Sequence, residues 1–278
     1  MFLTYWEVPI LRVSWILSRQ ENADVLDDGA LTYITKELLV QKRHRDTFEQ
    51  QLNADFSVFF HNRRFRVNIS KQQWHIMIVF RLFRENIPSL EEQWLPDTFH
   101  DLCKKTSGLI IISGPTGSGK STVLASMIEE INKKYKKHII SIEDPIEYIF
   151  TSKKSIIEQK ELGMDIMSFA DALKFTMRQN PDVILFGEIR DPKSLRNAVT
   201  LAETWHLVMT TIHSKSAAQT ISKMIDFFPP EQQDQIRFQL SENLLAIVNQ
   251  RLITNKDLHS RSLVQEIMVN NSAVANNI

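Results

Sequence analysis

The sequence predicts an α/β fold with a mostly parallel sheet, preceded by a small α+β domain. From Gly108 onward, short apolar runs typical of buried strands alternate with segments of helical periodicity, which indicates βαβ units. Before that point, runs rich in β-forming residues surround two helical segments and end near Ile87-Pro88. A chain of 278 residues has the length of about two domains. We therefore expect one domain over residues 1–88, a connector over residues 89–105 and a second domain over residues 106–278.

In the first domain, strands and helices are expected in mixed order. Glu7–Val13 is rich in β formers and contains Pro9, which indicates an edge or early strand position because proline cannot donate a ladder hydrogen bond. Helical spacing of apolar residues predicts a helix over Ala30–Gln41, and a second is expected over Arg43–Leu52. Further strands are expected at Asp55–His61, Arg64–Ile69 and His75–Phe83, the first two joined by a tight hairpin at Asn62-Arg63.

The second domain shows the alternation most clearly. Its strands are expected at Gly108–Ser113, His138–Ile142, Asp182–Gly187 and His206–Ile212. Helices are expected between them at Lys120–Asn132, Ser168–Arg178 and Pro192–Glu203. Two more helices, Ser216–Phe228 and Glu231–Arg251, are separated by Pro229-Pro230, and Leu263–Val269 is a last strand. The final segment, Asn270–Ile278, either frays or begins a helix.

Composition excludes several classes of protein. Lys plus Arg and Asp plus Glu both total 33, so no net charge steers the chain toward nucleic acid. The single cysteine, Cys103, excludes an intramolecular disulfide framework and a cysteine-rich zinc module. We find no apolar run long enough for a membrane span, and Met1–Leu17 lacks the basic start of a signal peptide. The expected compartment is the cytoplasm. Glycine is scarce, with seven residues.

The segment Gly114-Pro-Thr-Gly-Ser-Gly-Lys120-Ser121 satisfies the phosphate-binding loop pattern G-x-x-x-x-G-K-[ST]. An apolar strand precedes it and a helix follows, which is the context that the motif needs. Its backbone N–H groups and the helix N-terminus form a nest for phosphate oxygens, Lys120 reaches the β- and γ-phosphates, and the Ser121 hydroxyl ligates Mg²⁺. The candidate nucleotide-binding residues of this segment are Gly114, Pro115, Thr116, Gly117, Ser118, Gly119, Lys120, Ser121 and Thr122.

Two acidic segments follow predicted strands. Asp182–Glu188 is an apolar strand that ends in a carboxylate, and a phosphate-loop enzyme needs such a group to hold Mg²⁺ or to orient the attacking water. Ile142–Glu147 contains three carboxylates after another strand, and Glu143 is the candidate for a second acid that orients water or metal. The carboxyl ends of parallel strands face the ligand crevice of such sheets. The alternatives are a solvated strand end at Glu188 and a charged turn at Glu143.

His213, at the end of a predicted strand, is placed to sense a γ-phosphate, and its alternative is a structural histidine. His206 lies seven residues earlier. On one strand the two would point to opposite faces, roughly 23 Å apart at ~3.3 Å per residue, which excludes a shared metal. The basic runs Lys133–Lys137 and Gln41–Arg45 are interpreted as solvated helix ends, where cations suit the helix dipole.

The order of these motifs resembles a known family. After the phosphate-binding loop come Ile142–Glu147, Met177–Asp191, Ala202–His206 and Thr211–Ser214. This series resembles the secretion-type ATPases of bacterial type IV pili and type II secretion, whose corresponding motifs are the Walker A, Asp box, Walker B and His box. Two further stretches, Gln159–Gly163 and Ile225–Gln233, look most like the pilus retraction ATPases, and the zinc insert of assembly and secretion members is missing.

The resemblance implies an ATP-hydrolysing homohexameric motor that drives pilus retraction and twitching motility. It implies a PAS-like N-terminal domain joined to a RecA-like P-loop NTPase domain, with ATP and Mg²⁺ as cofactors and nucleotide bound between the two domains. The expected partner is an inner-membrane pilus platform protein, with the motor cytoplasmic and peripheral at the inner membrane. It also implies roles for three arginines: Arg66 and Arg81 neutralise γ-phosphate charge, and Arg190 couples the site to the next subunit. The alternative for each is an exposed or salt-bridged arginine.

Several positions depart from the family. Trp205 stands where the family has glycine, and a tryptophan there would strain a left-handed turn by ~1–2 kcal/mol. Trp15 likewise replaces a glycine, and Trp74-His75 stands where retraction ATPases often have Arg-Gly. The first domain is expected to be incomplete at its N-terminus and the second to be short at its C-terminus. Two alternative functions therefore stay open: an assembly or type II secretion ATPase, and a hydrolysis-poor nucleotide-binding paralogue that acts as an interaction subunit.

Overall fold

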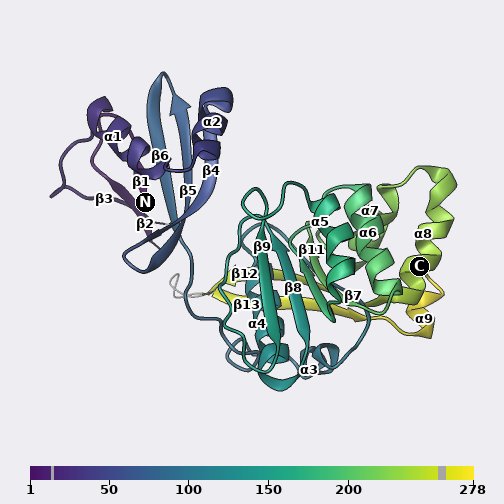
Figure 1. Ribbon diagram of the computed structural model, residues 1–278. Coiled ribbons are helices and arrows are strands. Elements are labelled where there is room, and N and C mark those ends of the chain that lie inside the picture. Colours follow the sequence, from purple (N-terminus) through teal and green to yellow (C-terminus); the bar gives the residue numbers. More distant parts are fainter. Residues whose placement is uncertain (14–15, 256–260) are drawn as a thin grey trace. The chain divides into compact units, whose positions relative to one another are not determined.

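Six antiparallel strands form the sheet of the first unit, Met1–Glu85 (Figure 1). The computed structural model describes residues 1–13, 16–255 and 261–278, without the side chains of residues 170, 171, 173 and 174. The sheet order is β3-β2-β1-β6-β5-β4. The strands are β1 (Phe2–Leu3), β2 (Ile10–Val13), β3 (Ile16–Arg19), β4 (Asn53–Phe60), β5 (Arg63–Gln72) and β6 (His75–Leu82).

Two helices cover one face of this sheet, because alternate residues of the strands are apolar and need burial. They are α1 (Asp28–Leu38), which Asp27 caps by accepting a hydrogen bond from the Ala30 N–H, and α2 (Lys42–Gln51). Leu31 of α1 packs with Phe56, Val67 and Ile78 of the strands. The predicted helices are confirmed, and so is the hairpin between β4 and β5, although its two-residue loop is His61-Asn62 and not Asn62-Arg63. The strand expected over Glu7–Val13 begins only at Ile10, and β1 and β3 were not predicted.

The second unit, Asn86–Ile278, contains a seven-stranded sheet in the order β13-β12-β7-β11-β10-β8-β9. All neighbouring strands are parallel except β13, which pairs antiparallel with β12. This arrangement confirms the predicted α/β class with a mostly parallel sheet. The strands are β7 (Gly108–Ser113), β8 (His138–Glu143), β9 (Ile156–Glu161), β10 (Val183–Phe186), β11 (Leu207–Ile212), β12 (Leu244–Thr254) and β13 (Arg261–Val269).

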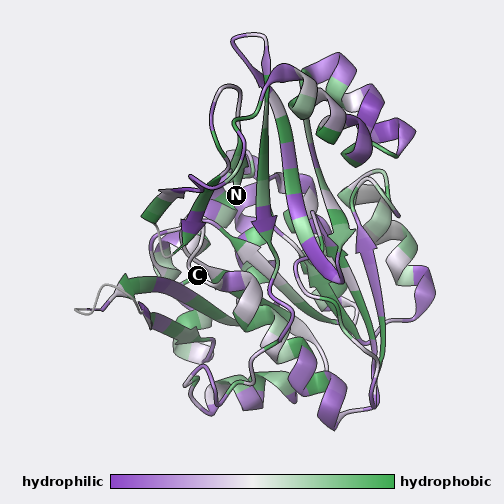
Figure 2. Cartoon of the chain, turned by 90° about the vertical axis from the view of Figure 1, so that its left-hand side faces the viewer, coloured by the Kyte–Doolittle hydropathy of each residue, from purple (hydrophilic) through white to green (hydrophobic). Residues whose placement is uncertain are grey.

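Helices cover both faces of this sheet, which is why its central strands read as continuous apolar runs. On one face, Leu109 and Ile111 of β7 pack toward α6 (Pro192–Glu203), α7 (Ala217–Asp226) and α8 (Pro230–Asn243). On the other, Ile110 and Ile112 pack toward α3 (Thr98–Cys103) and α4 (Lys120–Lys134). Figure 2 colours each residue of the chain by hydropathy, with apolar residues in green. The remaining elements are α5 (Phe169–Thr176), the 3₁₀ turn Met177–Gln179 and α9 (Ser272–Ala275).

The helix expected over Glu231–Arg251 is wrong in its second half. The helix α8 ends at Asn243, and the chain continues directly as β12, which is inserted between β7 and β13. A strand buried on both faces carries an unbroken apolar run, and periodicity cannot separate such a run from a buried helix. Ile247 and Val248, which are β-branched, were the local sign of a strand. The edge strand β9 was not predicted, because four of its six residues are polar.

The segment that we expected to be a connector packs onto the second unit. Leu90, Phe99 and Leu102 are buried in the core that α4 and β7 share. At two of the departures from the family, the backbone is left-handed: φ is +73° at Trp74 and +67° at Trp205. The strain expected for a tryptophan at such a position is therefore present. Trp15 lies outside the described residues.

Candidate active site

The phosphate-binding loop connects β7 to α4 at the carboxyl end of the sheet. Gly119, with φ +89°, is the residue before the helix, and no side chain of the described chain caps the first turn. The N–H groups at the start of α4 are thus available to an anion, and the helix dipole favours negative charge there. A Cβ built on Gly117 would meet nothing within 4 Å, so the crest of the loop is open.

The base of the loop is closely packed. Gly114 has φ +140°, and a Cβ there would lie 2.2 Å from the Gln250 carbonyl oxygen of β12. Only glycine fits that position. The Gln250 side-chain amide donates to the Ser118 carbonyl oxygen at 2.8 Å. The hydroxyl of Ser118 is buried and has no hydrogen-bond partner in the described chain, so the loop contains one unsatisfied polar group.

Lys120 folds its ammonium group back over the loop. Its Nζ donates to the carbonyl oxygens of Gly114 and Pro115, each at 3.0 Å, and lies 3.3 Å from Nδ1 of His213. Burial lowers the pKa of Lys120, while the nearby carboxylates of Glu188 and Glu147 oppose that shift. The ammonium therefore stands between the loop and the acidic strand ends, where it can meet a phosphate.

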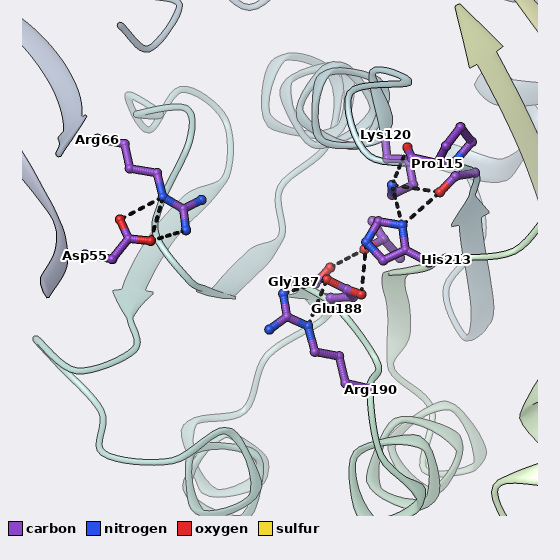
Figure 3. A network of polar contacts seen from close by, with 10 residues as sticks. Asp55, Arg66, Pro115, Lys120, Gly187, Glu188, Arg190 and His213 are labelled. Carbon is purple, nitrogen blue, oxygen red and sulfur yellow. Dashed lines mark hydrogen bonds and ion pairs between the residues drawn. The ribbon is translucent and has the colours of Figure 1, made fainter. Parts of the chain in front are cut away.

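His213 connects the loop to Glu188, as Figure 3 shows. Its Nε2 is 3.2 Å from Oε1 of Glu188, and its Nδ1 is 3.0 Å from the Gly114 carbonyl oxygen. One nitrogen cannot both donate to that carbonyl and accept from Lys120, so the proton on Nδ1 decides which contact holds. Lys223 supports the histidine from α7 by donating to its carbonyl oxygen at 2.8 Å.

Glu188 follows β10 and is partly buried, with 20% of its side chain exposed. Its Oε2 accepts two hydrogen bonds from Arg190, from Nε at 3.0 Å and from Nη2 at 2.9 Å. The turn before it is fixed on both sides. The Gly187 N–H donates to the Ile142 carbonyl of β8, and the Thr211 hydroxyl donates to the Gly187 carbonyl at 2.7 Å. Glu188 is thus held between the ends of β8 and β11.

Glu143 is the last residue of β8, beside the Gly187 turn, where a Cβ on Gly187 would lie 3.6 Å from the Glu143 Cα. Burial raises the pKa of the Glu143 carboxyl to about 7, and the like charge of Glu147 adds to this shift. Hydrogen bonds to the carboxylate oppose it, among them one donated by Gln159 at 3.5 Å. A carboxyl with a pKa near 7 is suited to accept a proton at physiological pH.

The donor set suits Mg²⁺ held together with phosphate. No cluster of three or more His, Cys, Asp or Glu residues that could hold a metal occurs among residues 1–13, 16–255 and 261–278. Mg²⁺ does not require one, since it binds through one or two protein oxygens, water and substrate phosphates. Ser121 in the first turn of α4 and Glu188 are oxygen donors of that kind. The open loop crest and the uncapped helix start suit the phosphates themselves.

Three predicted residues have other contacts. The hydroxyl of Thr122 lies 2.9 Å from that of Tyr148, and not at the loop crest. In the first unit, Arg66 makes a bidentate pair with Asp55, with Nη2 2.6 Å from Oδ2. Arg81 lies directly opposite Arg66 on the neighbouring strand β6. The alternative of a salt-bridged arginine therefore describes Arg66 in this structure, and a phosphate contact for either arginine stays a prediction.

Polar residues that no sequence motif predicted support the loop from beneath. Asn249 donates to the Ser113 hydroxyl at 2.9 Å and to the Ser214 carbonyl at 3.2 Å, which joins β12 to β7 and to the segment after His213. Gln250 was missed as well. It lies in no motif, and its only sign in the sequence was an amide that follows the apolar residues of a strand.

The comparisons with known proteins agree with this geometry. Residues 31–277 match the family described as "Type II/IV secretion system protein". A twitching motility protein of Neisseria gonorrhoeae is 40% identical over 269 residues, which cover 96% of this chain and 71% of that protein. The type IV pilus retraction ATPase PilT of Pseudomonas aeruginosa is 38% identical, with 96% of this chain and 77% of that protein covered.

A crystal structure of the pilus retraction motor PilT with bound ADP has the same fold. Its TM-score is 0.92 at 39% identity, over 99% of this chain and 80% of that one. The match extends over both units, including the small α+β unit that precedes the parallel sheet. The chain therefore belongs to the type II/IV secretion system protein family, and its similar relatives include twitching motility and pilus retraction ATPases.

Proposed function

We propose that this protein is a Mg²⁺-dependent ATPase that works as a homohexameric motor of a type IV pilus system and drives pilus retraction. The single observation that carries the enzymatic part is the chain of contacts Lys120–His213–Glu188, which joins the phosphate-binding loop to the acidic strand ends. The relatives named above support the pilus part, since they are described as twitching motility and retraction proteins.

Each residue of the site then has a defined task. The loop N–H groups and Lys120 bind the phosphates, and Ser121 and Glu188 hold Mg²⁺, which supplies charge neutralisation when bound. Glu143 accepts the proton of the attacking water, because its pKa of about 7 leaves it able both to take up and to release a proton. His213 lies between Lys120 and Glu188. A γ-phosphate would compete with His213 for the Lys120 ammonium, so the contacts of His213 would change when the phosphate binds.

Arg190 is placed to transmit this change to a neighbouring subunit. Its guanidinium holds Glu188, yet 70% of its side chain is exposed. An exposed cation next to the metal-binding carboxylate can contact a neighbouring subunit without leaving the site. We extend the proposal to Arg66 and Arg81, which would add positive charge on closure, and to an inner-membrane pilus platform protein as the partner. The motor would act at the cytoplasmic side of the inner membrane. None of the helices in the described chain combines the length and apolar character needed to cross a bilayer.

The hydrolysis-poor alternative was motivated by Trp15, Trp205 and the expected short ends, and the position of Trp205 removes that one of the three motives. Trp205 precedes β11, whereas His213 follows the same strand. Six strand residues at ~3.3 Å each separate them by roughly 20 Å, so the tryptophan lies at the opposite end of the sheet from the nucleotide loop. No comparable observation favours an assembly or secretion motor.

ATP turnover by the purified protein tests the enzymatic proposal. We expect Mg²⁺-dependent release of phosphate by the assembled wild type and its loss in Lys120→Ala. Phosphate release that is absent from a folded and assembled wild type would refute the ATPase. Expression in two strains tests the motor: restored twitching in a retraction-deficient strain supports retraction, and restored piliation in an assembly-deficient strain supports an assembly motor instead.

A further inference from the structure

Every tryptophan in the described chain occupies a left-handed backbone position. The φ angles are +60° at Trp6, +73° at Trp74, +56° at Trp94 and +67° at Trp205. Residues with a Cβ avoid this region, because the Cβ approaches the following carbonyl oxygen, and bulky residues avoid it most. Glycine enters it without that cost. Among residues 1–13, 16–255 and 261–278, the other residues at positive φ are Leu52, His61, Asn62, Gln73, Asn180 and five glycines.

None of the four indole rings gains burial in return. Their exposed fractions are 70% at Trp6, 92% at Trp74, 92% at Trp94 and 83% at Trp205. Tryptophan normally stabilises a protein by burying a large apolar surface. Here each ring stands in solvent on a turn that its own backbone angle destabilises, so neither packing nor conformation favours tryptophan at these positions.

The local hydrogen bonds identify two of these turns as glycine turns. Trp205 is the second residue after α6, and the next N–H, that of His206, donates back to the Leu201 carbonyl at 3.2 Å. This six-to-one bond with a left-handed residue before it is the Schellman motif, in which glycine predominates. The same bond joins the Leu95 N–H to the Leu90 carbonyl at 3.0 Å, with Trp94 as the left-handed residue.

Trp74 occupies an equally diagnostic position. With Gln73 it forms the two-residue loop between β5 and β6, and both residues have positive φ, at +47° and +73°. A two-residue hairpin with that backbone is a type I′ turn, whose preferred second residue is glycine. Meanwhile the whole chain has seven glycines in 278 residues, against an average usage of about 7%. The chain thus has few glycines and, at the same time, has tryptophan at turns where glycine is expected.

We infer that Trp6, Trp74, Trp94 and Trp205 stand at positions that are glycine in the native polypeptide. One difference in decoding accounts for all four. The codon UGA is tryptophan in some genetic codes and glycine in others, and it differs from the glycine codon GGA by a single base. A cell that decodes UGA as glycine makes each of these turns from the residue that its backbone requires. Trp15 falls under the same inference through its residue type alone.

Mass spectrometry of the protein isolated from its own source tests the decoding directly. We expect each peptide that spans one of these positions to be lighter by the difference between a tryptophan and a glycine residue. The nucleotide sequence should have UGA at each of these codons. Peptides of tryptophan mass, or UGG codons at these positions, would overturn the inference.

The physical basis has its own test in recombinant protein. We expect Trp205→Gly to raise the ratio of folded to unfolded protein about tenfold, and Trp205→Ala to leave it within about twofold, because alanine keeps the Cβ. Phe238→Gly is the matched control: this phenylalanine is also exposed, at 68%, but lies within α8, so glycine there should lower the ratio several-fold. Equal effects of Trp205→Gly and Trp205→Ala would overturn the argument from backbone strain.

A second inference concerns Gln250, which is completely buried on β12. Its amide donates to the Ser118 carbonyl oxygen at 2.8 Å, and its own Oε1 lies 3.5 Å from Nε2 of Gln265 on β13. A trans peptide directs its C=O and the following N–H in opposite directions. Holding the Ser118 carbonyl toward β12 therefore turns the Gly119 N–H away from β12. The geometry points to Gln250 as a positioning residue that presets the phosphate-binding loop.

Nucleotide binding separates this role from simple packing. We expect Gln250→Met to weaken ADP binding and to raise KM for ATP about tenfold, with kcat changed less than about threefold. Gln265→Met, the control, should change each less than twofold. Reduced stability of Gln250→Met with unchanged ADP affinity would overturn the assignment. The inference rests on the proposed ATPase, whose failure is distinct because the wild type itself would then release no phosphate.

Discussion

The pH dependence of catalysis should report the ionisation of Glu143. Burial raises the pKa of this carboxyl to about 7, so roughly one-tenth of it is ionised at pH 6 and roughly nine-tenths at pH 8. If the ionised form accepts the proton of the attacking water, kcat/KM for ATP rises about tenfold per pH unit below 6 and levels off above 8. The profile of kcat/KM is the appropriate measurement, because it reports the ionisation of the free enzyme.

Two variants make this prediction specific. Glu143→Gln should lower kcat by at least about 10²-fold and abolish the limb near pH 7. Glu147→Gln removes the like charge that raises the pKa of Glu143, so it should move the limb to lower pH. A wild-type profile that is flat between pH 5.5 and 8, or a limb that survives in Glu143→Gln, would refute the reasoning.

The same pKa shift affects stability with a defined sign. The folded-state pKa of Glu143 lies above its ordinary value of 4.5, so the folded protein binds the proton more tightly than the unfolded chain. The resulting stabilisation is complete below about pH 4.5 and is lost as the pH rises through 7. The shift corresponds to at most about 3 kcal/mol of unfolding free energy. Denaturant titrations of the wild type and Glu143→Gln at several pH values should show this component only in the wild type.

Three further outcomes are expected. Glu188→Gln should lower kcat by at least ~10²-fold while ADP still binds, as steady-state kinetics and calorimetry would show, and full activity would contradict a role in holding Mg²⁺. Gly114→Ala should cost more than ~3 kcal/mol of unfolding free energy, because its Cβ would lie 2.2 Å from a carbonyl oxygen, whereas Gly117→Ala should cost only ~1 kcal/mol. Asp55→Asn weakens the ion pair of Arg66, so ATP turnover should be kept or raised. Arg66→Ala should lower ATP turnover. An equal loss in both variants would indicate that the pair is structural.

Much of the site was readable from sequence because its motifs are short and local. Gly114–Ser121 fixes a loop conformation through its own glycines, and Glu188 ends an apolar strand that its composition identifies. Both depend on neighbours within a few residues. The helix that we wrongly expected over β12 has the opposite cause, because that segment depends on distant neighbours. The residues directly after Asn243, Leu244–Val248, are all apolar, and only the space between β7 and β13 makes this segment a strand.

The fold class, the loop and the carboxylates could be predicted from the sequence alone, because strand alternation and glycine-dependent turns are encoded in neighbouring residues. Which groups meet depends on the tertiary structure. The strand order brings His213, 93 residues after Lys120, within 3.3 Å of its ammonium. Burial, not the residue type, raises the pKa of Glu143. The left-handed angles of Trp6, Trp74 and Trp94 likewise came only from the structure, since a residue name does not contain its φ, and together with that of Trp205 they identify these positions as positions for glycine.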